Sequence, residues 1–113
     1  MNQVLLAGRL SAAEERPLPS GDVLVAFRIV VTRPPATTVR RARSGRPPTV
    51  DVIDCVAWRP TLQRSVLRWA PGDWVRVEGR LVRRFWRSRS GVASRSEVEV
   101  TRARRIGRPP APG

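Results

Sequence analysis

The sequence contains no histidine and only one cysteine, Cys55. Zinc sites are built from several cysteine and histidine ligands, so one copy of this chain cannot form such a site by itself. The absence of histidine also excludes acid–base and triad chemistries that use an imidazole. A lone cysteine cannot form an intrachain disulfide, which is typical of a reducing cytoplasm. We therefore expect a cytoplasmic protein that is not an enzyme and has no metal or cofactor.

Lysine is also absent, so all 22 basic residues are arginine, against 9 acidic residues and a formal net charge of +13. Such a charge opposes compaction by self-repulsion and favours a polyanionic partner. The guanidinium of arginine can donate two hydrogen bonds to one phosphate and can stack on a base, so arginine is well suited to binding nucleic acid. Coding bias in a GC-rich genome explains the missing lysine equally well, but it does not explain the uncompensated charge.

Long apolar runs are missing too. No run approaches the ~18 residues of a membrane span, and no charged segment precedes an apolar stretch after Met1. We expect neither a membrane contact nor a signal peptide. A length of 113 residues predicts one domain with a small core of its own. We assign residues 1–106 to this domain and residues 107–113 to a short basic, proline-rich tail.

Apolar alternation predicts five strands, and one segment has helical spacing. The expected strands are Asn2–Leu10, Asp22–Thr32, Thr49–Trp58, Asp73–Trp86 and Val92–Ile106. The helix is expected over Pro60–Ala70, with Trp69 in its apolar stripe and therefore in the core. Loops are expected over Ser11–Gly21 and a turn over Arg87–Gly91. This order predicts an all-β, five-stranded OB-fold Greek-key barrel with one helix between strands three and four.

The strand Asp73–Trp86 has two different faces. Alternation directs one set of side chains inward, namely Val75, Val77, Gly79, Leu81 and Phe85. It directs the other set outward, namely Trp74, Arg76, Glu78, Arg80, Val82, Arg84 and Trp86. Arg83 has inward parity, so the strand is expected to leave the core near it. The outward face carries several arginines and ends with the indole ring of Trp86. Such a face predicts a binding surface for a polyanion that carries bases.

The neighbouring strands are read in the same way. In the last strand, Val98 and Val100 are expected inside, and Glu97 and Glu99 outside. In the third strand, Cys55 is expected inside as a small core hydrophobe, and Trp58 outside. Trp74 stays open between a subunit interface and solvent.

Residues 33–48 contain no acid and five arginines, Arg33, Arg40, Arg41, Arg43 and Arg46. Ordinary hairpin loops have about 2–5 residues, so this long basic loop is expected to be functional or disordered. A flap that closes on a phosphate backbone is one interpretation. A solvated, disordered insertion is the other.

Seven motifs, in order along residues 1 to about 100, resemble the bacterial single-stranded DNA-binding proteins. They are Met1–Val4 with Gly8–Leu10, Pro19–Gly21, Val25–Phe27, Asp51–Trp58, Val77–Leu81, Trp86 and Ser96–Val98. The resemblance implies sequence-independent binding of single-stranded DNA by a homotetramer. It further implies that Trp58 and Trp86 stack on bases, with Arg84 as a cation on the same face. We expect the nucleic-acid-binding residues to be Trp58, Trp86, Arg84, Arg80, Arg28, Arg9, Arg40, Arg41 and Arg43.

The chain departs from this family in several places. Val52 stands where an aromatic is usual, residues 33–48 contain no aromatic, and Asp54 occupies an outward position that is often polar or basic. Binding is therefore expected to depend more on arginine than on stacking. The family's acidic, hydrophobic tip is missing from residues 108–113, so protein recruitment through it is not expected. The pattern indicates a short or specialised relative.

Other functions stay open beside DNA protection in replication, recombination or repair by a nucleoid-associated protein. An OB-fold that binds RNA, or an accessory protein of replication restart, would use the same face. A structural assembly module would use the charge for a protein partner. A homo-oligomer is also indicated by the apolar residues on both faces of Asn2–Leu10.

Overall fold

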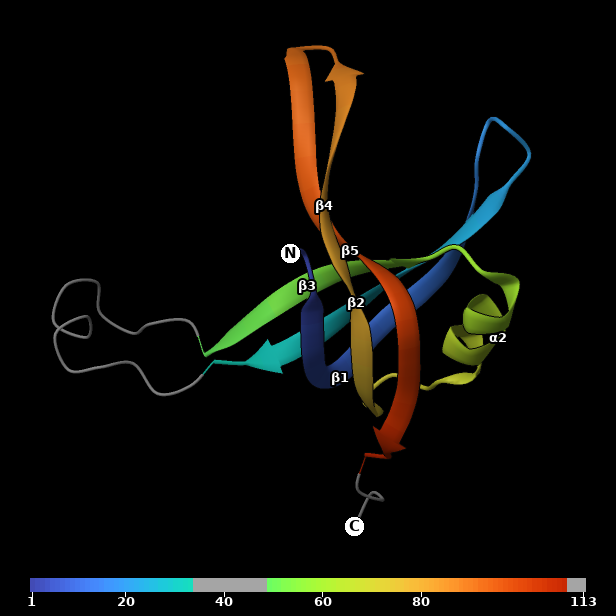
Figure 1. Cartoon of the computed structure of the whole chain (residues 1–113), viewed down its shortest axis with the longest axis vertical. Coiled ribbons are helices and arrows are strands. Elements are labelled where there is room, and N and C mark those ends of the chain that lie inside the picture. Colours follow the sequence, from blue (N-terminus) through green and yellow to red (C-terminus); the bar gives the residue numbers. More distant parts are fainter. Residues whose placement is uncertain (34–48, 110–113) are drawn as a thin grey trace, which may run out of the picture.

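The computed structural model describes residues 1–33 and 49–109, which form a closed five-stranded barrel and one helix (Figure 1). The elements are β1 (Val4–Pro17), β2 (Val23–Thr32), β3 (Val50–Ala57), α2 (Pro60–Arg68), β4 (Trp74–Ser88) and β5 (Gly91–Gly107). Around the barrel the order is β1-β2-β3-β5-β4, in which β3 and β5 pair in parallel and the other pairs are antiparallel. The OB-fold predicted from the sequence is confirmed.

β1 is longer than the sequence predicts. It continues to Pro17, so the loop expected over Ser11–Gly21 is reduced to a tight turn between Leu18 and Asp22. The first part of β1 pairs with β4 and the second with β2, with a register shift between Leu10 and Ala12. Such a bulge bends a strand and strengthens its twist, which lets β1 pass from one partner to the other and close the barrel.

The core fills the barrel with aliphatic side chains of moderate size. Fully enclosed members are Val25, Ile29, Val66, Val75 and Val77. α2 covers one end of the barrel, and Trp69, which follows it, lies edge-on to Phe27 with ring centroids 6.0 Å apart. The prediction that Trp69 packs in the core is confirmed. Within the described residues, no helix is long and apolar enough to cross a membrane.

Two motif glycines lie where backbones approach closely. A Cβ at Gly8 would overlap the Val30 carbonyl oxygen, and a Cβ at Gly79 would overlap the carbonyl oxygen of Glu99. β4 also changes register against β5 between Glu78 and Gly79. The missing side chain is what permits this approach.

Beyond the barrel, β4 and β5 continue as a two-stranded arm, residues 82–97, which projects from one end of the molecule (Figure 1). The prediction that β4 leaves the core is confirmed. The strand leaves the core before Arg83, because Leu81 is already exposed. Leu81 is 52% exposed and Phe85 66% exposed, so the prediction that they lie in the core is wrong. Pairing of β1 with β4 ends at Gly79, and further along β4 no described strand but β5 pairs with it. The expected turn Arg87–Gly91 is shorter, because β4 extends to Ser88 and β5 begins at Gly91.

Candidate nucleic-acid interface

One face of the arm and the adjoining barrel carries both tryptophans that were predicted to stack on bases. Trp86 lies on β4 within the arm, and Trp58 directly follows β3. The guanidinium of Arg84 lies over the Trp58 ring, 5.6 Å from its centroid. Arg95, the cross-strand partner of Arg84, lies 6.0 Å from the centroid of the Trp86 ring. We call these four residues, Trp58, Arg84, Trp86 and Arg95, the front platform.

Glu97 is buried next to the front platform. It is 6% exposed, and its carboxylate accepts a hydrogen bond from Nε of Arg84. Glu97 points away from the core, as predicted, but it is buried and not exposed to solvent, because it lies against the Arg84 side chain. A buried carboxylate needs a cation and hydrogen bonds to offset its lost hydration, and Arg84 supplies both.

Two further arginines of the predicted site also contact carboxylates. Nε of Arg28 lies 2.9 Å from Oδ1 of Asp54 across β2 and β3. Nη2 of Arg80 lies 3.1 Å from Oε1 of Glu99 across β4 and β5. Arg28 therefore offsets the repulsion that Asp54 would exert on a phosphate. Exposed ion pairs are worth only about 0–1 kcal/mol, so phosphate can replace these carboxylates at small cost.

A groove of about 250 Å³ lies between Arg95 of the front platform and the pair formed by Arg28 and Asp54. Its charged lining residues are Glu14, Arg16, Arg28, Asp54, Arg95 and Glu97. A larger groove, about 510 Å³, lies between α2 and the barrel part of β4 and β5, and includes Arg59, Arg76, Arg102 and Arg104. We call it the α2 groove. Neither groove is lined by Trp58 or Trp86, so the volume of a groove does not identify the front platform as the site.

Arg9 is not brought together with the front platform. Its guanidinium lies over the ring of Trp74, 4.8 Å from the centroid, at the first residue of β4. Trp86 lies toward the other end of this strand, about 40 Å away along it at ~3.3 Å per residue. Trp74 is half-buried and stacks on Arg9.

The basic loop of residues 33–48 is described only at Arg33. Its guanidinium pairs with Asp51 at 2.6 Å, and the hydrogen bond from Arg33 lowers the pKa of the Asp51 carboxyl. The predicted contacts of Arg40, Arg41 and Arg43 lie outside the described residues, as does the prediction of a flap.

Two residues of the site were not found from the sequence. Nε2 of Gln63, on α2, lies 3.0 Å from the carbonyl oxygen of Trp58 and 3.1 Å from that of Ala57, to which it donates. Gln63 therefore fixes the backbone where Trp58 leaves β3. Arg95 could have been found by pairing the two arm strands around their turn. Gln63 has no local signal, because its partners come from another element.

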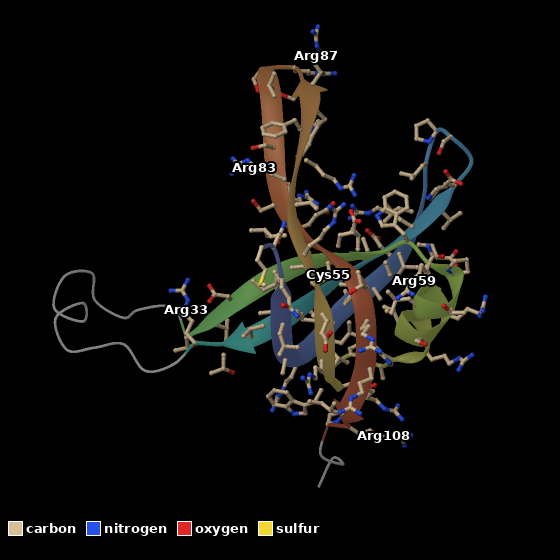
Figure 2. All side chains as sticks on the ribbon, viewed as in Figure 1. Arg33, Cys55, Arg59, Arg83, Arg87 and Arg108 are labelled. Atoms are coloured by element: carbon tan, nitrogen blue, oxygen red, sulfur yellow. The ribbon has the colours of Figure 1, made fainter. Side chains whose placement is uncertain are left out.

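Cys55 lies inside the barrel at 1% exposure, as predicted (Figure 2). Burial, with smaller contributions from Asp54 and Glu97, raises the pKa of its thiol to about 12. A thiol of this kind is unreactive, because the thiolate is the nucleophile and the metal ligand. Among the described residues, no three cysteine, aspartate or glutamate side chains are placed to hold one metal ion.

Comparison with known proteins agrees with the fold. The sequence model of the Single-strand binding protein family matches residues 1–106. A solved structure described as the Plasmodium falciparum SSB complex with ssDNA is similar in fold, with a TM-score of 0.72 and 20% identity over 95% of this chain and 94% of that chain. Among curated proteins, no sequence matches the chain.

Proposed function

The chain belongs to the single-strand binding protein family, and we propose that it binds and protects single-stranded DNA without regard to sequence. The observation that carries this proposal is the front platform. It presents two indole rings, Trp86 at 45% exposure and Trp58 half-buried, each with a guanidinium over it. Single-stranded DNA offers the matching chemistry, since every base has a face that stacks and every linkage carries a phosphate.

When DNA binds, the arginines of the front platform must exchange their contacts within the protein for contacts with DNA. In the free protein, Arg84 contacts both Trp58 and Glu97. A base stacks on each indole and contributes about 1–3 kcal/mol, whatever its identity. The arginines then turn from rings and carboxylates toward phosphates, which releases counterions from the DNA and makes affinity fall with salt. No step breaks a covalent bond, so we propose a binding protein rather than an enzyme.

We further propose that the protein acts as a homotetramer. Residues 4–8 of β1 pair with β4, whereas the pairing of β1 with β2 begins at Arg9. Among residues 1–33 and 49–109, no strand pairs with the other edge of residues 4–8, which would let a strand of another copy pair there. Leu5, within this edge, is 55% exposed. A monomer in light scattering at micromolar concentration would contradict this part of the proposal.

We propose that residues 1–106 form the binding domain and residues 107–113 a tail. We place the protein with the nucleoid in the cytoplasm, where it would serve replication, recombination or repair.

Fluorescence titration with oligo(dT) at two salt concentrations tests the binding site. Trp86→Ala is expected to weaken binding about tenfold or more, on the magnitude for one stacked base. Trp74→Ala is the matched control, because it removes the same ring from the far end of β4. Unchanged affinity for Trp86→Ala would remove Trp86 from the site. Tighter binding of matched RNA would favour an RNA-binding function, and isotherms insensitive to salt and oligonucleotide would favour a protein partner.

A further inference from the structure

The arm has a second face, opposite the front platform. It carries the β4 residues that alternate with Arg84 and Trp86, together with their cross-strand partners on β5. We call this set the reverse face, namely Arg83, Phe85, Arg87, Val92, Ser94 and Ser96. Phe85 is 66% exposed and Val92 75% exposed. A phenylalanine so exposed is not explained by packing in the core.

Arg83 is held beside Phe85 by a serine. Its Nε and Nη2 lie 3.2 and 2.8 Å from Oγ of Ser94, to which both donate. This places its guanidinium 5.8 Å from the centroid of the Phe85 ring. The ring and the cation are thus arranged as Trp58 and Arg84 are on the front platform, where the corresponding separation is 5.6 Å.

The reverse face differs from the front platform in its charge. Its six residues include no acid, whereas Arg84 on the front platform is paired with Glu97. Arg83 projects from the side of the arm and Arg87 from its tip (Figure 2). A phosphate near Arg83 therefore competes with a neutral hydroxyl and not with a carboxylate.

From these observations we propose that the reverse face is a second stacking site for single-stranded DNA, with a base on Phe85 and phosphates on Arg83 and Arg87. The inference rests on the proposed function and extends it: the strand passes around the arm and contacts both faces. An exposed apolar patch alone would fit many partners. A cation fixed over an aromatic ring, with no competing acid, favours a ligand that carries both bases and phosphates.

The experiment compares oligo(dT) of two lengths, because one OB-fold covers about 4–16 nucleotides. The short oligomer is expected to occupy the front platform, and the long one to reach the reverse face. Phe85→Ala should therefore weaken binding of the long oligomer about tenfold and leave the short one nearly unchanged. Leu67→Ala, which removes an exposed apolar side chain from α2, outside the arm, is the control and should bind both as before.

Two conservative variants separate stacking from a general apolar contact. Phe85→Leu keeps the apolar side chain but loses the ring, so it should bind as weakly as Phe85→Ala. Phe85→Tyr keeps the ring and should bind the long oligomer as the unaltered protein does. Full affinity in Phe85→Leu, or an unchanged long-oligomer affinity in Phe85→Ala, would overturn the inference. So would a loss of affinity accompanied by a smaller mass in light scattering, which would make the reverse face a contact between copies.

Failure of this inference is distinct from failure of the proposed function. If the unaltered protein binds oligo(dT) and Trp86→Ala weakens binding of both lengths while Phe85→Ala does not, only the reverse face is rejected. If the unaltered protein binds neither length, the proposed function is rejected and the reverse face with it.

Discussion

The guanidinium of Arg84 lies 5.6 Å from the centroid of the Trp58 ring. The same guanidinium donates through Nε to the buried carboxylate of Glu97. Arg84 therefore contacts both Trp58, whose ring is proposed to stack on a base, and Glu97, whose charge repels phosphate. The affinity of the front platform should depend on this acid as much as on the arginines, because DNA must displace the internal contacts of Arg84 before using it.

Replacing Glu97 with glutamine should tighten the binding of single-stranded DNA. Glutamine retains a carbonyl oxygen for Arg84 but removes the charge that competes with phosphate. If one more phosphate is neutralised, the slope of log affinity against log salt steepens by about 0.7, which is about fivefold in affinity at ~0.1 M salt. Titration of Glu97→Gln at several salt concentrations measures both quantities.

The control for this variant is Glu78→Gln. Glu78 lines the α2 groove, away from Trp58 and Trp86, and its replacement changes the net charge by the same amount. Its effect on slope and affinity should be clearly smaller. Equal gains in the two variants would show that Glu97 acts only through the total charge of the protein.

Replacing Gln63 with methionine should destabilise the end of β3. Nε2 of Gln63 donates to three carbonyl oxygens, those of Val23, Ala57 and Trp58, at 2.8, 3.1 and 3.0 Å. Methionine has similar length but no donor, so the free energy of unfolding should fall by about 1–2 kcal/mol. Urea unfolding checks the value, and Ser65→Ala, which removes a hydrogen bond within α2, should cost less. An unfolding curve identical to that of the unaltered protein would rule out this anchoring.

The barrel could be predicted because its signals are local. Alternation along β4 and helical spacing along α2 each show in a few consecutive residues. The end of β1 could not be predicted in this way. Ser11–Pro17 is polar, and it becomes a strand only because β2 supplies backbone partners there.

Three of the four front-platform residues, Trp58, Arg84 and Trp86, were named from the sequence, but Arg95 and the contacts among the four were not. Parity correctly separated Trp86 from Phe85, yet it could not tell that the barrel ends before Phe85 and leaves both exposed. The pairing of Arg84 with Glu97 depends on the register of two strands. Composition shows an excess of arginine, but it does not show which arginines are already paired with carboxylates of the protein.

Replacing Gly79 with alanine should destabilise the barrel strongly. The added Cβ would overlap the backbone carbonyl of Glu99, and backbone in a paired strand cannot move aside as a flexible side chain can. Overpacking of this kind costs about 1–3 kcal/mol. Gly107→Ala is the control, because the nearest atom to its Cβ would be 3.5 Å away, on the side chain of Trp74. Thermal unfolding of the two variants should differ clearly, and equal melting temperatures would contradict the close approach at Gly79.

The stability of the protein should fall above pH 9, and Cys55 should be the cause. Burial raises the pKa of its thiol to about 12, whereas the unfolded thiol titrates near ~8.5. Between these values the unfolded chain loses its proton first, so the folded state binds more protons and the free energy of unfolding decreases as pH rises. Below the unfolded pKa both states are protonated, and this contribution to stability is fully present.

The composition makes this test unusually clean. The sequence has no lysine, tyrosine or histidine, so Cys55 is the one side chain whose unperturbed pKa falls between about 8 and 11. Urea unfolding at pH 8 and pH 10 should show a loss of about 1–2 kcal/mol, from the ~1.4 kcal/mol that each pH unit contributes within the window. Cys55→Ala should be less stable at pH 8 because it leaves a small cavity, yet lose almost nothing between the two pH values. An equal loss in Cys55→Ala would mean that the thiol stays protonated in both states or ionises in both.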